Sequence, residues 1–158
     1  MEEFGFEMNA GLHAAGAVRA ATDSQRPVVI VDDNTDDQME LKRELEHLLG
    51  AMPVLTFQDG TALLRYLDAH PRESERPRLI FLDLNMVGMD GLMTLELLQG
   101  RLAMAGVPVV AVSGTRNAAQ VTRAFESGAQ AFLPKPVSRW DMIRVLHGKT
   151  TTDGSTYR

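Results

Sequence analysis

The sequence predicts an α/β protein in which a doubly wound, five-stranded parallel sheet is covered by helices on both faces. From Pro27 onward, short apolar runs rich in β-branched residues alternate with segments whose apolar residues recur at helical spacing. The apolar runs do not alternate with polar residues, which is typical of parallel strands buried on both faces. We expect the five strands at residues 28–31, 54–57, 79–82, 109–112 and 131–133.

Each strand is followed by the pattern of an amphipathic helix, so we expect five helices. In the first, Asp36 and Asp37 fall in the first turn, where acidic side chains complement the helix dipole. The second should begin near 59–61, the third cover 91–100 and the fourth 117–127. The fifth begins after Ser138, because Ser138-x-x-Asp141 resembles a capping box. The inward residues are, in order, Leu41, Leu45, Leu48 and Leu49; Leu63, Leu64 and Leu67; Leu95, Leu98 and Leu102; Val121, Ala124 and Phe125; and Met142, Ile143 and Leu146.

Prolines and connectivity predict the order of the strands. Pro53 precedes the second strand and Pro134 follows the fifth, positions that suit edge strands because proline cannot donate a ladder hydrogen bond. Right-handed crossovers then favour the flavodoxin-like order 2-1-3-4-5. In such sheets ligands bind at the carboxyl ends of the strands, near the switch point between strands one and three.

Length and composition favour one globular domain with short tails. The 158 residues are enough for one domain, which we expect at 27–147, between a flexible tail at 1–26 and a second tail at 148–158. The net charge of −5 gives no field to attract nucleic acid, and the lack of cysteine excludes disulfides. No apolar stretch approaches the roughly 20 residues that span a bilayer, and the N-terminus does not resemble a secretory signal. We therefore expect a cytoplasmic protein without membrane insertion.

Several polar residues follow the predicted strands at the carboxyl edge of the sheet. Asp32 and Asp33 follow the first strand, Asp83 the third, Ser113 the fourth and Lys135 the fifth. Hard divalent cations such as Mg²⁺ prefer oxygen ligands and leave positions open for an anionic substrate. Asp33, Asp83 and one carbonyl from the following loop could supply part of such a shell, with Asp32 holding a coordinated water. The sequence therefore predicts a Mg²⁺ site that is open to solvent.

The same residues predict a phosphoryl acceptor. Lys135 offers a positive charge and Ser113 a hydroxyl donor for a phosphoryl group. Asp83 is the central carboxylate of the set, and carboxylates are known covalent phosphoryl acceptors. Phosphoryl transfer needs mainly positioning and charge neutralisation, which this set supplies. We therefore expect Asp83 to form an aspartyl phosphate.

The order and spacing of these motifs resemble the receiver domains of bacterial two-component response regulators, the CheY-like family. Each motif is unspecific alone, but the ordered set is specific and covers 27–147. The matching motifs are Val31-Asp32-Asp33-Asn34, Leu82-Asp83-Leu84-Asn85-Met86, Met89-Asp90-Gly91, Val112-Ser113-Gly114, Gly128-Ala129 and Phe132-Leu133-Pro134-Lys135-Pro136.

The resemblance implies roles for the charged residues. Asp83 is implied to accept a phosphoryl group from the histidine of a sensor kinase, and Lys135 to pair with the phosphate. Asp33, Asp83 and the backbone carbonyl of Asn85 are implied to bind Mg²⁺, and Asp32 to assist through a water molecule.

The resemblance also implies a conformational switch. Ser113 would move toward the phosphate and Phe132 would turn into the space vacated, changing the face made by the fourth helix, fifth strand and fifth helix. Plain alternatives are that Ser113 caps the next helix and that Phe132 is a core residue. The resemblance further implies a cis Lys135-Pro136 peptide, and lifetime tuning of the phosphorylated state by Asn85 and Thr115.

Two loops depart from the simplest pattern. Val87 stands where the family usually has proline, so we expect Val87-Gly88 to make this loop more mobile. The stretch 70–77 is expected to be a solvated loop longer than a minimal connection. Similar loops occur in regulators that resemble partners of bacteriophytochromes. A bacteriophytochrome is therefore one candidate for the sensor kinase.

Three classes of function are compatible with an aspartyl phosphate or with this fold. The first is a single-domain response regulator, not an enzyme, that binds a downstream protein partner or instead passes its phosphate to a histidine phosphotransfer protein; a dimer is left open. The second is a small Mg²⁺-dependent phosphatase of the haloacid dehalogenase type, which needs an aspartate where Asn85 stands. The third is a flavin or nucleotide binder, but no glycine-rich phosphate loop follows Val31.

Overall fold

The structure is a computed structural model that describes residues 26–88, 90–101, 104–115 and 117–147. The two predicted tails, apart from Arg26, lie outside the described residues, as does the predicted core residue Leu102. Arg26, assigned to the tail from the sequence, is buried, and its guanidinium donates to the carbonyl oxygens of Arg76 and Pro77. The folded domain therefore includes Arg26.

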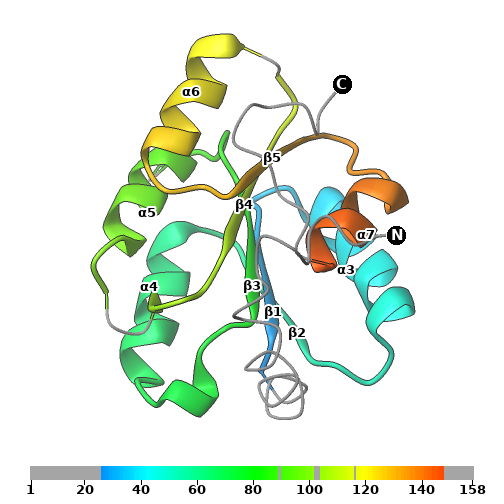
Figure 1. The fold of residues 1–158 in the computed structure, drawn as a ribbon, viewed down its shortest axis with the longest axis vertical. Helices are drawn as coiled ribbons and strands as arrows, with labels where there is room; N and C mark the ends of the chain where they lie inside the picture. Colours follow the sequence, from blue (N-terminus) through cyan, green and yellow to red (C-terminus); the bar gives the residue numbers. More distant parts are fainter. Residues whose placement is uncertain (1–25, 89, 102–103, 116, 148–158) are drawn as a thin grey trace.

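Five parallel strands form one sheet in the order β2-β1-β3-β4-β5, which confirms the predicted topology (Figure 1). The proline-flanked strands β2 and β5 lie at the two edges. Three strands extend one residue beyond the prediction, into Asp83, Ser113 and Pro134. The strands are β1 (Val28–Val31), β2 (Val54–Phe57), β3 (Leu79–Asp83), β4 (Val109–Ser113) and β5 (Ala131–Pro134).

Helices cover both faces of the sheet, with α4, α5 and α6 on one side and α3 and α7 on the other (Figure 1). The helices are α3 (Thr35–Leu49), α4 (Gly60–Ala69), α5 (Gly91–Leu98), α6 (Ala118–Glu126) and α7 (Arg139–Leu146). Helix α5 ends before Gly100, whose φ of 84° is incompatible with a continuing helix. The predicted loop at 70–77 contains a single 3₁₀ turn, η1 (Glu73–Glu75).

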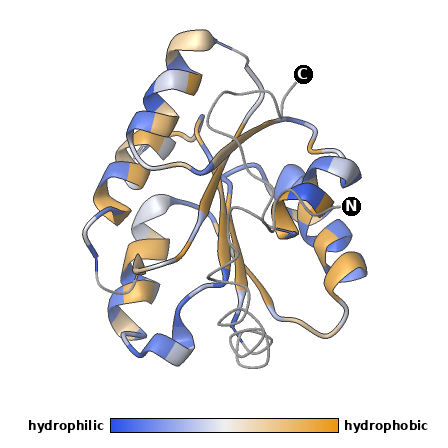
Figure 2. Cartoon of the chain, viewed as in Figure 1, coloured by the Kyte–Doolittle hydropathy of each residue, from blue (hydrophilic) through white to orange (hydrophobic). Residues whose placement is uncertain are grey.

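The core consists of two apolar layers, one on each face of the sheet. Alternate strand residues contribute to opposite layers, so that Val29, Ile80 and Ala111 face α4–α6 while Ile30, Phe81 and Val112 face α3 and α7. In Figure 2 the strands are hydrophobic along their length and the helices are two-sided. Strands buried on both faces explain why the sequence shows continuous apolar runs.

Each α-helix starts with a side-chain cap at the carboxyl edge of the sheet. Asn34, Asp59, Asp90, Asn117 and Ser138 each accept a hydrogen bond from a backbone amide in the first turn. The expected cap at Ser138 is confirmed, whereas the alternative that Ser113 caps the next helix is wrong, because Asn117 occupies that position. These caps fix where each loop of the carboxyl edge ends.

Candidate functional site

The sheet order brings the predicted site residues to one edge. Asp32 and Asp33 follow β1, Asp83 ends the neighbouring strand β3, and Ser113 ends β4. Lys135 follows β5, and its amide donates to the carbonyl oxygen of Ser113 at 2.8 Å. Residues up to 103 positions apart in the chain, Asp32 and Lys135, therefore meet in one site.

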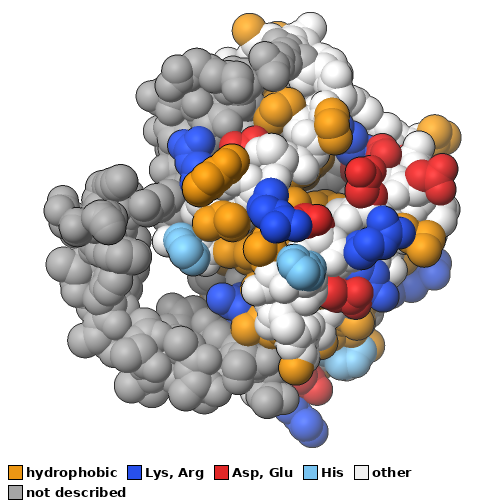
Figure 3. All heavy atoms as spheres, turned by 90° about the vertical axis from the view of Figure 1, so that its right-hand side faces the viewer, with side chains coloured by type: hydrophobic (Ala, Val, Ile, Leu, Met, Phe, Trp, Pro, Cys, Tyr) orange, Lys and Arg blue, Asp and Glu red, His pale blue; other side chains and the backbone are white. Residues whose placement is uncertain are grey.

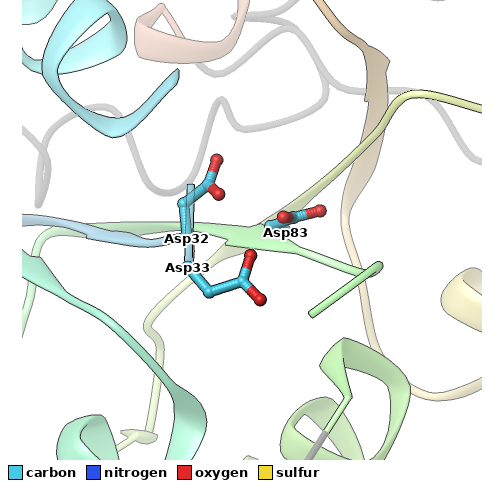
Figure 4. Close-up of side chains that lie close together, drawn as sticks. All are labelled: Asp32, Asp33 and Asp83. Atoms are coloured by element: carbon cyan, nitrogen blue, oxygen red, sulfur yellow. The ribbon is translucent and has the colours of Figure 1, made fainter. Parts of the chain in front are cut away.

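Three carboxylates form an acidic cluster at this edge. One oxygen each of Asp32, Asp33 and Asp83 lies within 4.8 Å of the others. Figure 4 shows the side chains of Asp32 and Asp33 leaving the end of β1 on opposite sides, with Asp83 beside them at the end of β3. Oxygen ligands at this spacing could hold a hard divalent cation.

Backbone amides fix one oxygen of each carboxylate. Asp32 Oδ1 accepts from Asn34 N at 2.9 Å, and Asp83 Oδ1 accepts from Asn85 N at 3.0 Å. Asp33 Oδ2 accepts from Val87 N at 2.9 Å. A proline at position 87 would have no amide proton for this bond, so the departure from the usual family residue attaches the loop to the acidic cluster. The expected mobility of this loop stays a prediction, but this bond holds it at one point.

Lys135 connects the acidic cluster to helix α3. Its Nζ lies 2.9 Å from Asp32 Oδ2, 3.0 Å from Asp37 Oδ2 and 3.2 Å from Asp83 Oδ2. Partial burial by itself lowers the pKa of the Lys135 ammonium, but hydrogen bonds to Asp32 and Asp37 and the nearby charges outweigh it and raise the pKa above its usual value. Lys135 is therefore a permanent cation beside the Asp83 carboxylate.

Asp37 is a member of the site that sequence reasoning missed. The sequence identifies it only as an acid in the first turn of a helix, a position that the structure also shows. Its position four residues after Asp33 places it on the first turn of α3, facing Lys135. No motif marks such a contact, because it depends on how α3 packs against the loop after β5.

Asp32 has an unusual protonation equilibrium. Burial raises the pKa of this carboxyl group, and the neighbouring charge of Asp83 adds to the increase. Hydrogen bonds from Lys135 and from the Asn34 amide oppose it without cancelling it. A divalent cation in the cluster would reverse this balance, because it favours the ionised carboxylate.

A second cluster of polar side chains lies at the end of β4. Asn85 Nδ2 donates to Ser113 Oγ, Ser113 Oγ donates to Gln120 Oε1, and Gln120 Nε2 donates to Asn85 Oδ1. Thr115 N also donates to Ser113 Oγ. Sequence reasoning selected Ser113, Asn85 and Thr115 but missed Gln120, which has no motif and is brought to them only by the packing of α6.

Phe132 and Ser113 occupy adjacent strands in the interior. Both are fully buried, and Phe132 packs in the apolar layer under α4, α5 and α6. The core interpretation of Phe132 is therefore confirmed, and its role as a switch stays a prediction. The Lys135–Pro136 peptide is cis, as the family resemblance implies.

A cavity of about 380 Å³ borders the acidic cluster between α3 and α7. Asp32, Asp83 and Lys135 line one part of it. The remainder is lined by buried strand residues such as Phe81 and by residues of α3, of α7 and of the loop between β5 and α7. Arg139 of α7 donates to Glu44 of α3 across it. Figure 3 shows this side of the molecule, where acidic and basic side chains are interspersed rather than segregated by sign. The cavity therefore reaches Asp83 and Lys135 from the side of α3 and α7.

A model of the response regulator receiver domain matches residues 28–147 of this chain. The chain therefore belongs to the response regulator receiver domain family, which confirms the family predicted from the ordered motifs. Receiver domains generally bind Mg²⁺ at an acidic pocket, and a cluster of two buried aspartates and one half-buried aspartate is present here.

Known proteins similar to this chain include response regulators and histidine kinases. It is 29% identical to the two-component response regulator ARR7 of Arabidopsis thaliana, covering 83% of this chain and 66% of ARR7. It is 32% identical to the nitrate/nitrite response regulator NarL of Escherichia coli, covering 78% of this chain and 55% of NarL. The solved structure of the bacteriophytochrome response regulator AtBRR is similar with a TM-score of 0.67 at 30% identity, covering 78% of this chain and 91% of that one.

None of the helices within the described residues is long and apolar enough to cross a membrane.

Proposed function

We propose that this chain is a response regulator of the single-domain type that accepts a phosphoryl group on Asp83 in a Mg²⁺-dependent reaction. The observation that carries the proposal is the position of Asp83. Its carboxylate lies in the acidic cluster with Oδ2 3.2 Å from Lys135 Nζ, and it lines the cavity. The coverage of 91% of AtBRR supports a protein built mainly of this domain.

In the proposed step, a carboxylate oxygen of Asp83 attacks the phosphorus of a phosphohistidine in the donor protein. The P–O bond to Asp83 forms as the P–N bond breaks, and the departing imidazole nitrogen keeps the electron pair and takes a proton from water. Lys135 offsets the negative charge on the phosphoryl oxygens. Its shared hydrogen bonds to Asp32 and Asp37 hold the ammonium beside Asp83.

The residues present fit a Mg²⁺ ion. Asp33, Asp83 and the carbonyl of Asn85 would hold it, and Asp32 would assist through water. The bound ion would supply positive charge to the phosphoryl oxygens during transfer. Because carboxylates dominate this donor set, a hard oxygen-binding cation is the expected occupant.

The output is proposed to be a change in the face formed by α6, β5 and α7. Ser113 would turn toward the phosphoryl group and Phe132 toward the space that Ser113 leaves, while Asn85 and Thr115, both exposed, tune the lifetime of the phosphorylated state. Trp140 on α7 is 75% exposed and available to a downstream partner.

The pathway is proposed only by class. A sensor histidine kinase is the expected phosphoryl donor, and the similarity to AtBRR supports a bacteriophytochrome as one candidate. A relay to a histidine phosphotransfer protein is the alternative. In either pathway the chain acts in the cytoplasm as a phosphoryl acceptor and not as an enzyme with a separate substrate.

Labelling with acetyl phosphate and Mg²⁺ tests the acceptor. Intact-mass and peptide mass spectrometry should find one phosphoryl group on Asp83, and Asp83→Asn should lose it, whereas Asp36→Asn, an exposed aspartate outside the cluster, should keep it. Labelling of another residue in the wild type would refute the assignment. Release of many phosphate equivalents per protein would favour the phosphatase alternative.

A further inference from the structure

Three side chains at the carboxyl edge of β4 form a closed ring of hydrogen bonds. Asn85 Nδ2 donates to Ser113 Oγ at 2.8 Å, Ser113 Oγ to Gln120 Oε1 at 3.0 Å, and Gln120 Nε2 to Asn85 Oδ1 at 2.9 Å. Every member donates once and accepts once within the ring, an arrangement in which each bond polarises the next. The ring joins the loop after β3, the end of β4 and the first turn of α6.

The ring uses the one proton that Ser113 can donate. A serine hydroxyl has a single proton and two acceptor lone pairs. The proton goes to Gln120, and the lone pairs accept from Asn85 Nδ2 and from Thr115 N at 3.2 Å. Because Ser113 is fully buried, solvent does not substitute for these partners. A phosphoryl oxygen on Asp83 can therefore receive this proton only when Gln120 releases it.

The hydrogen bond between Gln120 and Ser113 takes the place of one that a glutamine at this helical position often makes to the capping residue. Gln120 is the third residue after the cap Asn117, where a glutamine commonly reaches back to the amide of the capping residue. Here the Asn117 amide donates to Thr115 Oγ1 at 3.0 Å instead. Asn117 Oδ1 still accepts from the first-turn amides, so α6 keeps its start whether or not the ring is closed.

We propose that Gln120 is a positioning residue that holds the Ser113 proton away from Asp83 in the unphosphorylated protein. Gln120 and an Asp83-bound phosphoryl group compete for the hydrogen bond that Ser113 donates. Phosphorylation of Asp83 would therefore change a contact of the first turn of α6. The inference rests on the proposed phosphorylation of Asp83. It assigns to Gln120 a regulatory contact that opposes the phosphorylated state.

The competition predicts that an apolar residue at position 120 strengthens binding of a phosphoryl analogue. Beryllofluoride with Mg²⁺ is the probe, and its apparent Kd is measured by fluorine NMR. For Gln120→Met, of similar length but without the acceptor, we expect affinity to rise about two- to tenfold, the range for loss of one competing neutral hydrogen bond. Gln130→Met, at an exposed glutamine before β5, is the matched control and should leave the Kd unchanged.

The proposal requires that the effect of Gln120→Met on the beryllofluoride Kd depends on Ser113. In a Ser113→Ala background Gln120→Met should have no effect on the Kd, because the contested proton is absent; an independent packing effect would persist there. Unchanged or weaker binding by the folded Gln120→Met single variant overturns the inference, as does an increase that persists without Ser113. If Gln120→Met does not fold, Gln120→Leu takes its place.

The ring can also be tested without a phosphoryl analogue. In the unliganded protein, Gln120→Met should shift the side-chain amide resonances of Asn85, while Gln130→Met should not. Unmoved Asn85 resonances would overturn the ring while leaving the proposed function intact. If the ring is present but the wild type binds no beryllofluoride, the proposed function fails, and the competition inferred from it fails with it.

Discussion

At the scale of single residues, the site is a balance between one cation and several acids. Lys135 Nζ contacts three carboxylates within 3.2 Å, and two of these, Asp32 and Asp83, are buried. Like charges at this spacing repel one another, and the ammonium of Lys135 offsets part of that repulsion. A divalent cation bound in the cluster would also offset the repulsion between the carboxylates. Its binding would therefore increase the free energy of unfolding.

Replacing Lys135 should therefore make stability depend on Mg²⁺. In EDTA, Lys135→Met should lower the free energy of unfolding by about 2 kcal/mol, because several carboxylates lose their shared counter-charge. Excess Mg²⁺ should restore part of that loss by binding the folded state. Urea unfolding in EDTA and in Mg²⁺ measures both effects.

Lys42→Met is the matched control for this experiment. Lys42 Nζ lies 3.6 Å from Glu46 on the surface of α3, and such an exposed pair contributes less than about 1 kcal/mol. Its replacement should change stability little and should not increase the response to Mg²⁺. Equal stability of Lys135→Met and wild type in EDTA would contradict the proposed charge balance.

The raised pKa of Asp32, caused first by burial, predicts a specific pH dependence. In the unfolded chain the Asp32 carboxyl group has a pKa of 3.8. As the pH falls, the folded protein therefore protonates Asp32 before the unfolded chain does. The folded state then binds more protons, so this group makes the free energy of unfolding fall as pH rises through the folded pKa. In EDTA, Asp32→Asn should remove that contribution in the pH range between 3.8 and the raised pKa of the folded state. Identical pH profiles of the two proteins would refute it.

At the scale of elements, the end of β3 and the start of helix α5 are in very close contact. Gly91 begins α5, and its amide donates to the carbonyl of Leu84 at 3.2 Å. A Cβ at position 91 would lie 2.3 Å from the carbonyl oxygen of Asp83 and 2.4 Å from Leu84 Cα. Only glycine permits this approach, since both contacts are to backbone.

Gly91→Ala should consequently lower the stability of the domain and displace Asp83, the proposed acceptor. We expect a loss of about 1 to 3 kcal/mol in the free energy of unfolding, typical of overpacking, with weaker beryllofluoride binding because Asp83 is displaced. Gly114→Ala is the control, because a Cβ there meets no atom within 4 Å and its φ is not positive. Thermal unfolding measures the stability of both variants, and fluorine NMR measures their beryllofluoride binding. Beryllofluoride binding by Gly91→Ala equal to that of the wild type would contradict the prediction.

At the scale of the whole molecule, the sheet is held together at the amino edge as well as at the functional edge. Arg26 lies before β1, and its Nε and Nη2 donate to Arg76 O at 2.9 Å and Pro77 O at 2.8 Å, just before β3. Arg78 N donates to Pro27 O at 2.7 Å in the same place. These bonds align β1 and β3, the two strands that carry the acidic cluster at their other ends.

Arg26→Ala should therefore lower the free energy of unfolding by about 2 kcal/mol, because two backbone carbonyls lose a charged donor. Arg26→Lys should recover only part of this, since an ammonium cannot reproduce the planar fork of the guanidinium. Arg65→Ala, at an exposed arginine of α4, is the control and should change stability by less than about 0.5 kcal/mol. If all three variants unfold alike, Arg26 does not align the strands.

Much of the fold and part of the site were predictable from the sequence. The continuous apolar runs predicted the strands to within one residue at each end, because a strand buried on both faces needs no polar positions. The edge positions of Pro53 and Pro134 followed from the missing amide proton of proline. Helix ends were less accurate, as the early end of α5 shows, because apolar spacing does not specify the residue at which a helix stops.

The sequence by itself determined which residues reach the carboxyl edge of the sheet, because strand ends and connectivity are local and topological properties. Asp32, Asp33, Asp83, Ser113 and Lys135 were predicted there for this reason. Only the tertiary structure decided that Asp37 shares Lys135, that Val87 binds Asp33 and that Gln120 accepts the Ser113 proton. These contacts depend on how helices and loops pack against the sheet, and a linear pattern contains no record of the distances that packing creates.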